Sequence, residues 1–268
     1  MAVPKLSIPI LTDFQAQSPA RQLMEALSLG EIKKDYSEVK IAEANRNRTI
    51  AADLIANHNA DELFKPESES LGRNVLHYAI FAKDTENALA LINKKNAMPD
   101  QDGKQTGVTP DQLFQQDKFG VTALHKAIEK ANYNVEKEYD KDKEKKAEKA
   151  RKAMNEVSLA LIEIGNSDHV FTPDTHGFTP LHRAIEQGNQ EIALALVKKT
   201  GVTNEHLQKT TKYTNKTALM MAEETQMDDV AAAIRNAIAN KEKLVPESIQ
   251  EVVPQPQYTQ LKLVPTRG

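Results

Sequence analysis

Apolar and polar positions along this chain recur as paired helical segments. In the clearest pair, residues 179–187 predict a first helix, and Gly188 with Asn189 predicts a helix stop and a turn. The apolar positions of residues 191–197 then fit a second, outer helix. Such a pair cannot bury its apolar surface alone, so the pattern predicts that further copies stack against it.

Four further copies can be aligned with this pair. Residues 122–127 and 74–79 keep its Leu, His and Ala, and each copy follows a glycine. Residues 217–222 keep the Thr, Leu and Ala but carry Met220 at the His position. Asn215 stands there in place of the glycine, as a left-handed turn allows.

The most degenerate copy comprises residues 37–42 as a first helix and residues 49–55 as a second. Only its spacing and its apolar pattern support it. Residues 18–27, which begin with Ser18-Pro19 and are followed by Gly30, predict a separate capped helix ahead of this copy.

The hexapeptide Thr179-Pro180-Leu181-His182-Arg183-Ala184 resembles the ankyrin-repeat signature T-P-L-H-x-A almost letter for letter. The resemblance implies an all-α ankyrin-repeat solenoid of about five helix-turn-helix repeats, with an N-terminal capping helix and two insertions. In such a stack the threonine caps the inner helix, and the leucine and alanine point into the core. The resemblance also implies that His77, His125 and His182 bridge neighbouring turns by hydrogen bonding.

The intervals between signature histidines exceed the ankyrin period of about 33 residues. We therefore expect insertions near residues 94–116 and 132–153. Residues 109–114, at the end of the first insertion, predict a short capped helical turn. The second insertion is rich in alternating charges, which predicts a protruding hairpin formed by extension of both helices of its repeat. The alternative is a partner-docking arm with Tyr133 and Tyr139 as its contacts.

These patterns divide the chain into three parts. We expect an N-terminal segment with the capping helix at residues 1–30, the ankyrin-repeat domain at 31–242, and a proline-containing tail at 243–268. Two prolines make the N-terminus a poor signal peptide, and no apolar stretch reaches the length of a membrane span. We therefore expect a cytoplasmic protein, present as a monomer.

Composition narrows the classes of partner and chemistry. The formal net charge of −3 gives no general attraction to nucleic acid or to an anionic membrane. The absence of cysteine excludes disulfides, thiol nucleophiles and thiolate zinc sites. No phosphate-binding glycine loop or hydrolase motif is present. His169 and His176 lie near Asp168 and Asp174, but their positions suit turns better than a metal site. We expect no cofactor and no metal.

The ankyrin resemblance implies a protein-interaction scaffold that binds its partner through the concave face. The alternative is an enzyme, or an enzyme-regulating protein, with an unrecognised site in the insertions. The degenerate repeats, rich in Lys, Asn and Gln, also resemble those of ankyrin-containing effectors of intracellular bacteria. Such an effector would act in the host-cell cytosol. The family's binding positions fall on the turn tips and the exposed sides of the inner helices: Leu71, Tyr78, Phe81, Phe119, Lys126, Glu129, Lys130, His176, Arg183, Glu186 and Thr214.

Phe119 is the strongest of these candidates, because an exposed aromatic residue is typical of an interface hot spot. The alternative is that its ring folds back against the neighbouring long loop.

Overall fold

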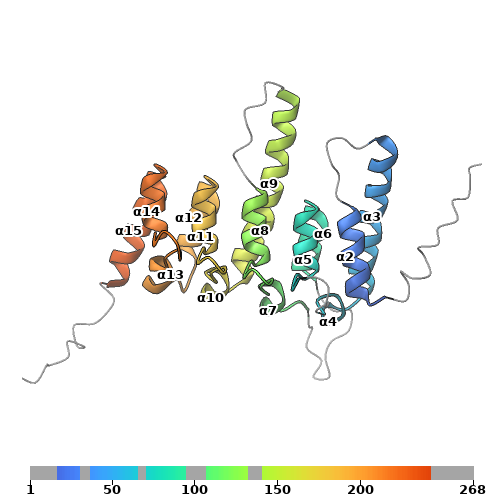
Figure 1. The fold of residues 1–268 in the computed structure, drawn as a ribbon, viewed down its shortest axis with the longest axis horizontal. Coiled ribbons are helices and arrows are strands. Elements are labelled where there is room, and N and C mark those ends of the chain that lie inside the picture. The colour runs from blue at the N-terminus through green and yellow to red at the C-terminus, as the bar shows by residue number, and fades with distance from the viewer. Residues whose placement is uncertain (1–16, 31–36, 66–70, 95–106, 132–140, 243–268) are drawn as a thin grey trace, which may run out of the picture.

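The computed structural model describes residues 17–30, 37–65, 71–94, 107–131 and 141–242. Its helices form a row in which each longer helix packs against a neighbour (Figure 1). Within these residues the structure contains helices and turns, with an isolated bridge between Thr210 and Thr217, and no strand. The chain is therefore all-helical over its described part.

Five antiparallel helix pairs make up this row. Their bounds are Pro19–Leu29 (α2) with Glu38–Asn57 (α3), Val75–Phe81 (α5) with Thr85–Ile92 (α6), Ala123–Lys130 (α8) with Lys141–Ile164 (α9), Pro180–Glu186 (α11) with Gln190–Lys198 (α12), and Ala218–Glu224 (α14) with Asp228–Glu242 (α15). The first members pack on one another in sequence, α2 to α5 to α8 to α11 to α14. The second members do the same, α3 to α6 to α9 to α12 to α15, so the row has an inner and an outer layer.

Four short helices join these pairs. They are Ala60–Leu63 (α4), Pro110–Leu113 (α7), Ser167–Val170 (α10) and Asn204–Gln208 (α13). The predicted capped turn at residues 109–114 is confirmed as α7, where the side chains of Thr109 and Gln112 form a capping box. The other three short helices show that this turn is a repeated element and not a feature of the insertion alone.

The first helix pair differs from the prediction. Residues 37–42 and 49–55 are not two helices, because α3 runs without interruption from Glu38 to Asn57. No glycine or proline lies between these segments to end the helix. The partner of α3 is instead α2, whose first turn is capped by Ser18 as predicted. The capping helix and the degenerate copy thus form one pair.

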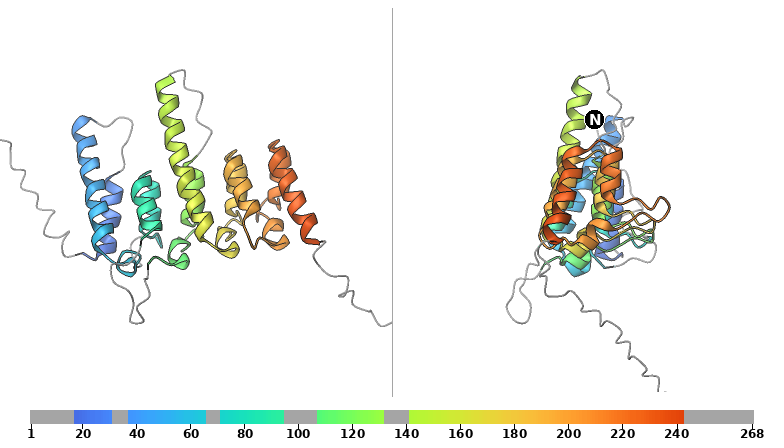
Figure 2. Two further views of the ribbon diagram at one scale, coloured as in Figure 1. Left: turned by 180° about the vertical axis from the view of Figure 1, so that it is seen from behind. Right: turned by 90° about the vertical axis from the view of Figure 1, so that its left-hand side faces the viewer.

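The insertion at residues 132–153 also differs in part from the prediction. The outer helix α9 begins at Lys141 and projects beyond its neighbours (Figure 2). The inner helix α8, however, ends at Lys130, so the described residues extend only one of the two helices. Tyr133, Tyr139, the first part of the insertion at 94–116 and the tail at 243–268 lie outside the described residues.

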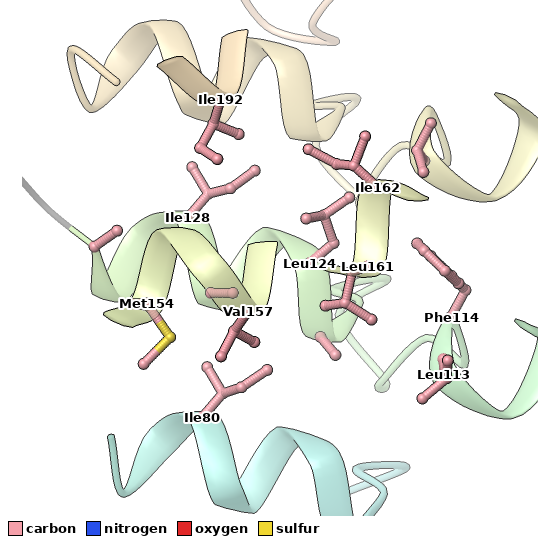
Figure 3. Close-up of a cluster of buried hydrophobic side chains, with 14 of the residues drawn as sticks. Ile80, Leu113, Phe114, Leu124, Ile128, Met154, Val157, Leu161, Ile162 and Ile192 are labelled. Carbon is pink, nitrogen blue, oxygen red and sulfur yellow. The ribbon is translucent and has the colours of Figure 1, made fainter. Parts of the chain in front are cut away.

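The core lies between the two layers. Leu124 and Leu181 of the inner helices are fully buried, as is Leu161 of α9. Figure 3 shows Leu124 and Leu161 close together, with Ile128 toward Ile192 of the next pair. Alanines at signature positions, such as Ala127 and Ala184, are also fully buried, and their small size lets adjacent helices approach. The signature positions therefore form the contact between layers.

Candidate functional site

The turns that precede α8 and α11 are each built around a buried aspartate. Oδ1 of Asp117 accepts hydrogen bonds from the amides of Phe119, at 2.9 Å, and Val121, at 3.0 Å. Oδ1 of Asp174 does the same for His176, at 2.8 Å, and Phe178, at 3.0 Å. Because the carboxylate replaces missing backbone partners, each turn holds one conformation.

Successive turns are joined at their tips by backbone hydrogen bonds. The carbonyl oxygen of Leu71 accepts from the amide of Lys118 at 3.0 Å, and that of Phe119 accepts from Thr175 at 3.0 Å. The carbonyl oxygen of His176 accepts from Lys212 at 2.8 Å. The predicted tip residues thus link each turn to the next, and the turns extend together from one side of the helices (Figure 2).

Close approach between turns explains a glycine at the tip. Gly120 has a φ of +72°, and a Cβ atom there would lie 2.8 Å from the amide nitrogen of Thr175. Both the left-handed backbone and the contact disfavour any side chain. Asn215, expected to replace this glycine in the last turn, has a φ of 55°, which confirms the left-handed conformation.

The side chains at the tips point away from the core. Leu71 is 42% exposed and Phe119 is 45% exposed, while His176 and Thr214 are also exposed. On the inner helices Glu129 and Glu186 are exposed, and the other predicted binding residues are half-buried: Tyr78, Phe81, Lys126, Lys130 and Arg183. The side chains at all of the predicted positions are thus at least partly exposed to solvent, and their role in binding stays a prediction.

Arg183 is more constrained than the sequence suggests. Its guanidinium lies 2.8 Å from Oδ2 of Asp174 and 2.9 Å from Oε2 of Glu186. It also lies 4.3 Å from the centre of the Phe178 ring. Burial opposes ionisation of Asp174, but the hydrogen bond from Arg183 and those from two backbone amides outweigh it and lower the pKa of this carboxyl. Arg183 therefore holds its turn against the inner helix.

The signature histidines are buried, and two of them bridge neighbouring turns as the resemblance implies. Nε2 of His77 lies 3.0 Å from the carbonyl oxygen of Val121, and Nε2 of His125 lies 2.9 Å from that of Phe178. Nε2 of His182 lies near the carbonyl groups of Lys209 and Lys216 but forms no hydrogen bond of ordinary geometry.

Burial lowers the pKa of each of these three histidines to about 4, although carbonyl groups act in the opposite direction. The imidazoles are therefore neutral at pH 7, and their partners are those of a structural role.

Four exposed or cationic residues on this surface were not among the binding residues predicted from the sequence. Tyr213 is 82% exposed and its ring centre lies 5.7 Å from that of His176. Met220, which replaces the signature histidine, is 50% exposed. Arg73 and Lys118 place their cationic groups over the rings of Phe81 and Phe119, at 4.6 Å and 5.1 Å. Arg73, Lys118 and Tyr213 lie within two residues of a predicted tip, and Met220 stands at a signature position; these are the signals that could have found them.

Over the described ranges, no group of three or more His, Asp or Glu side chains is placed to hold a metal ion. The helices in the same part of the chain include none that is both long and apolar enough to span a bilayer.

Comparison with known protein families identifies one segment of the chain as a known repeat. The family model for the ankyrin repeat matches residues 176–208, which contain a tip, the helices α11 and α12, and the short helix α13. The chain contains an ankyrin repeat at these residues. No curated protein matches it. The matched ankyrin repeat contains the signature hexapeptide, so the resemblance in the sequence is confirmed there.

Proposed function

We propose that all five helix pairs act as ankyrin repeats and that the chain is a protein-interaction scaffold. Ankyrin repeats are typically interaction modules without enzymatic activity. The four pairs outside the matched repeat support this proposal because they stack in the same two layers. The partner would be a protein, bound by a single copy of the chain, and neither nucleic acid nor a membrane.

The observation that carries this proposal is the exposed edge formed by the turn tips. Leu71 and Phe119 are large apolar residues left in solvent on turns that hydrogen bonds hold in place. Tyr213 adds an exposed aromatic residue to the last turn. Rigid, exposed aromatic side chains gain contact area on binding with little loss of conformational entropy, and they are enriched among hot spots.

The proposal is tested by affinity capture from cell lysates with quantitative mass spectrometry. We would compare the wild type with the double variant Phe119→Ala, Tyr213→Ala. The matched control is Val39→Ala, Ile164→Ala, which removes exposed apolar side chains from the outer helices, where Val39 is 77% exposed and Ile164 is 38% exposed. Arg183 is unsuitable for such a test because its loss would disturb Asp174.

A protein that the wild type and the control retain, and that the tip variant loses, supports binding through this face. A protein that all three chains retain equally would place the binding surface elsewhere. If the chain is a bacterial effector, the same face would meet a host protein, and capture should succeed from host lysate rather than from lysate of the source cell.

A further inference from the structure

Three cationic side chains surround a single aromatic ring on the inner face. The ring belongs to Phe81, at the end of α5, and is half-buried. The distances to its centre are 4.6 Å from Cζ of Arg73, 4.9 Å from Nζ of Lys126 and 5.5 Å from Nζ of Lys130. Cations over a ring face are attracted by its quadrupole, so Phe81 favours the grouping of these like charges.

Neighbouring carboxylates only partly neutralise this cluster. Lys126 pairs with Glu129 at 2.6 Å, whereas Lys130 has no carboxylate partner among the described residues. Arg73 lies 3.5 Å from Oδ2 of Asp117, and the other oxygen of that buried carboxylate already accepts two backbone amides. A local positive charge therefore remains on a chain whose formal net charge is −3.

An unused hydrogen-bond donor lies beside the cluster. Nε of Arg73 is buried and makes no hydrogen bond, because its distance to Asp117 exceeds an ordinary hydrogen bond. Arg73 also lines a cleft of about 200 Å³ between α2 and α5, together with Ser28, Tyr78, Phe81 and Ala82. A buried donor without a partner is unfavourable. The Arg73 side chain as a whole is 26% exposed, so an acceptor that enters the cleft would meet its exposed part.

We propose that the cationic patch formed by Arg73, Phe81, Lys126 and Lys130 binds an acidic segment of a partner protein. One carboxylate enters the cleft and accepts a hydrogen bond from Arg73, and further carboxylates pair with Lys126 and Lys130. This inference rests on the proposed function and names the chemistry of the partner. A nucleic acid fits less well, because its binding needs many phosphate contacts and this patch offers three cations.

The test measures binding of a fluorescein-labelled oligoglutamate peptide by fluorescence anisotropy at about 20 mM and about 150 mM salt. The variant Lys126→Glu, Lys130→Glu reverses two charges of the patch. The matched control, Lys149→Glu, Lys198→Glu, changes the net charge equally on exposed residues of α9 and α12. Circular dichroism should show equal helicity for all three chains.

We expect saturable binding by the wild type that weakens at least about tenfold in the patch variant and less than about twofold in the control. The variant Phe81→Leu leaves the charge unchanged and should weaken binding by about threefold, since it removes the ring that holds the cations together.

Equal losses in the patch variant and the control would show that only net charge matters and would overturn the inference. Absence of saturable binding by the wild type, or tighter binding of a labelled oligothymidylate, would overturn it as well. Neither result bears on capture of a partner through Phe119 and Tyr213, so the proposed function would then stand or fall on its own test.

Discussion

Nε2 of His206 lies 2.9 Å from Oδ1 of Asp168, which belongs to the preceding short helix. The amide of Thr203 donates to Nδ1 of the same ring, so Nε2 carries the proton and donates to Asp168. Equivalent contacts join His169 to Asp111 at 3.0 Å and Gln112 to Asp61 at 2.9 Å. Each short helix is thus bonded to the one before it, and these contacts form a second connection along the stack, beside that of the turn tips.

The two partners of this contact should differ in their effect on stability. Asp168 is largely exposed, so Asp168→Ala should lower the free energy of unfolding by less than about 1 kcal/mol. His206 is buried and its ring stacks on that of Phe171, so His206→Ala should cost about 1–3 kcal/mol. Urea denaturation of both variants and of the double variant gives their coupling energy. Additive losses would mean that the contact contributes nothing to stability.

Truncation of a signature leucine should leave a cavity between the layers. Leu181 and Leu124 are fully buried, so replacing either with alanine should lower the free energy of unfolding by about 2–5 kcal/mol. Leu29→Ala is the control, because this leucine is 58% exposed, and it should cost less than about 0.5 kcal/mol. Similar losses for buried and exposed leucines in urea denaturation would contradict the described core.

Gly120→Ala should destabilise the protein more than Gly188→Ala. Both residues have positive φ angles, of 72° and 67°, so each variant carries the cost of a left-handed alanine, about 1 kcal/mol. Only at Gly120 would the new Cβ meet the neighbouring backbone, whereas nothing lies within 4 Å at Gly188. The difference between their thermal midpoints measures the contact between turns, and equal midpoints would show that the turns are further apart.

Mild acid should destabilise the fold through the signature histidines. The pKa values of His77, His125 and His182 are about 4 in the folded state and return to about 6.5 on unfolding. The unfolded chain therefore binds more protons between these values, so stability is retained above pH 6.5 and lost as pH falls toward 4. The loss can reach about 1.4 kcal/mol per pH unit for each histidine. Urea denaturation from pH 7.5 to 4.5 measures it, and a flat profile would contradict it.

Removal of residues 134–152, with a short turn in their place, should leave the stack folded. The described side chains of this segment are largely exposed, and burial in α9 begins at Met154. The ion pair between Glu148 and Lys152 that would be lost lies on the surface. Circular dichroism melting should show a cooperative transition close to that of the full chain, whereas global unfolding would show that this part of α9 supports the core.

Several elements could be derived from residue identity because they depend on local chemistry. Thr122 and Thr179 cap their helices, and Asn215 adopts the left-handed turn, since these properties follow from a side chain and its own backbone. The short helices α7 and α13 share a local pattern too, a capping residue followed by an acidic residue and a capping-box partner, as in Thr203-Asn204-Glu205-His206. This capping pattern predicts a short helix wherever it occurs, but only at residues 109–114 is one predicted from the sequence.

By itself, the sequence determined the helical pairs, the ankyrin repeat at residues 176–208, the buried leucines and alanines, and the burial of the signature histidines, because periodicity and capping act within a few residues. Tertiary structure decided that α3 pairs with α2, because this pairing depends on contacts between the two helices. It also decided which side chains meet across pairs. The cations around Phe81 and the bond from His206 to Asp168 come from different helices, and packing alone brings them together.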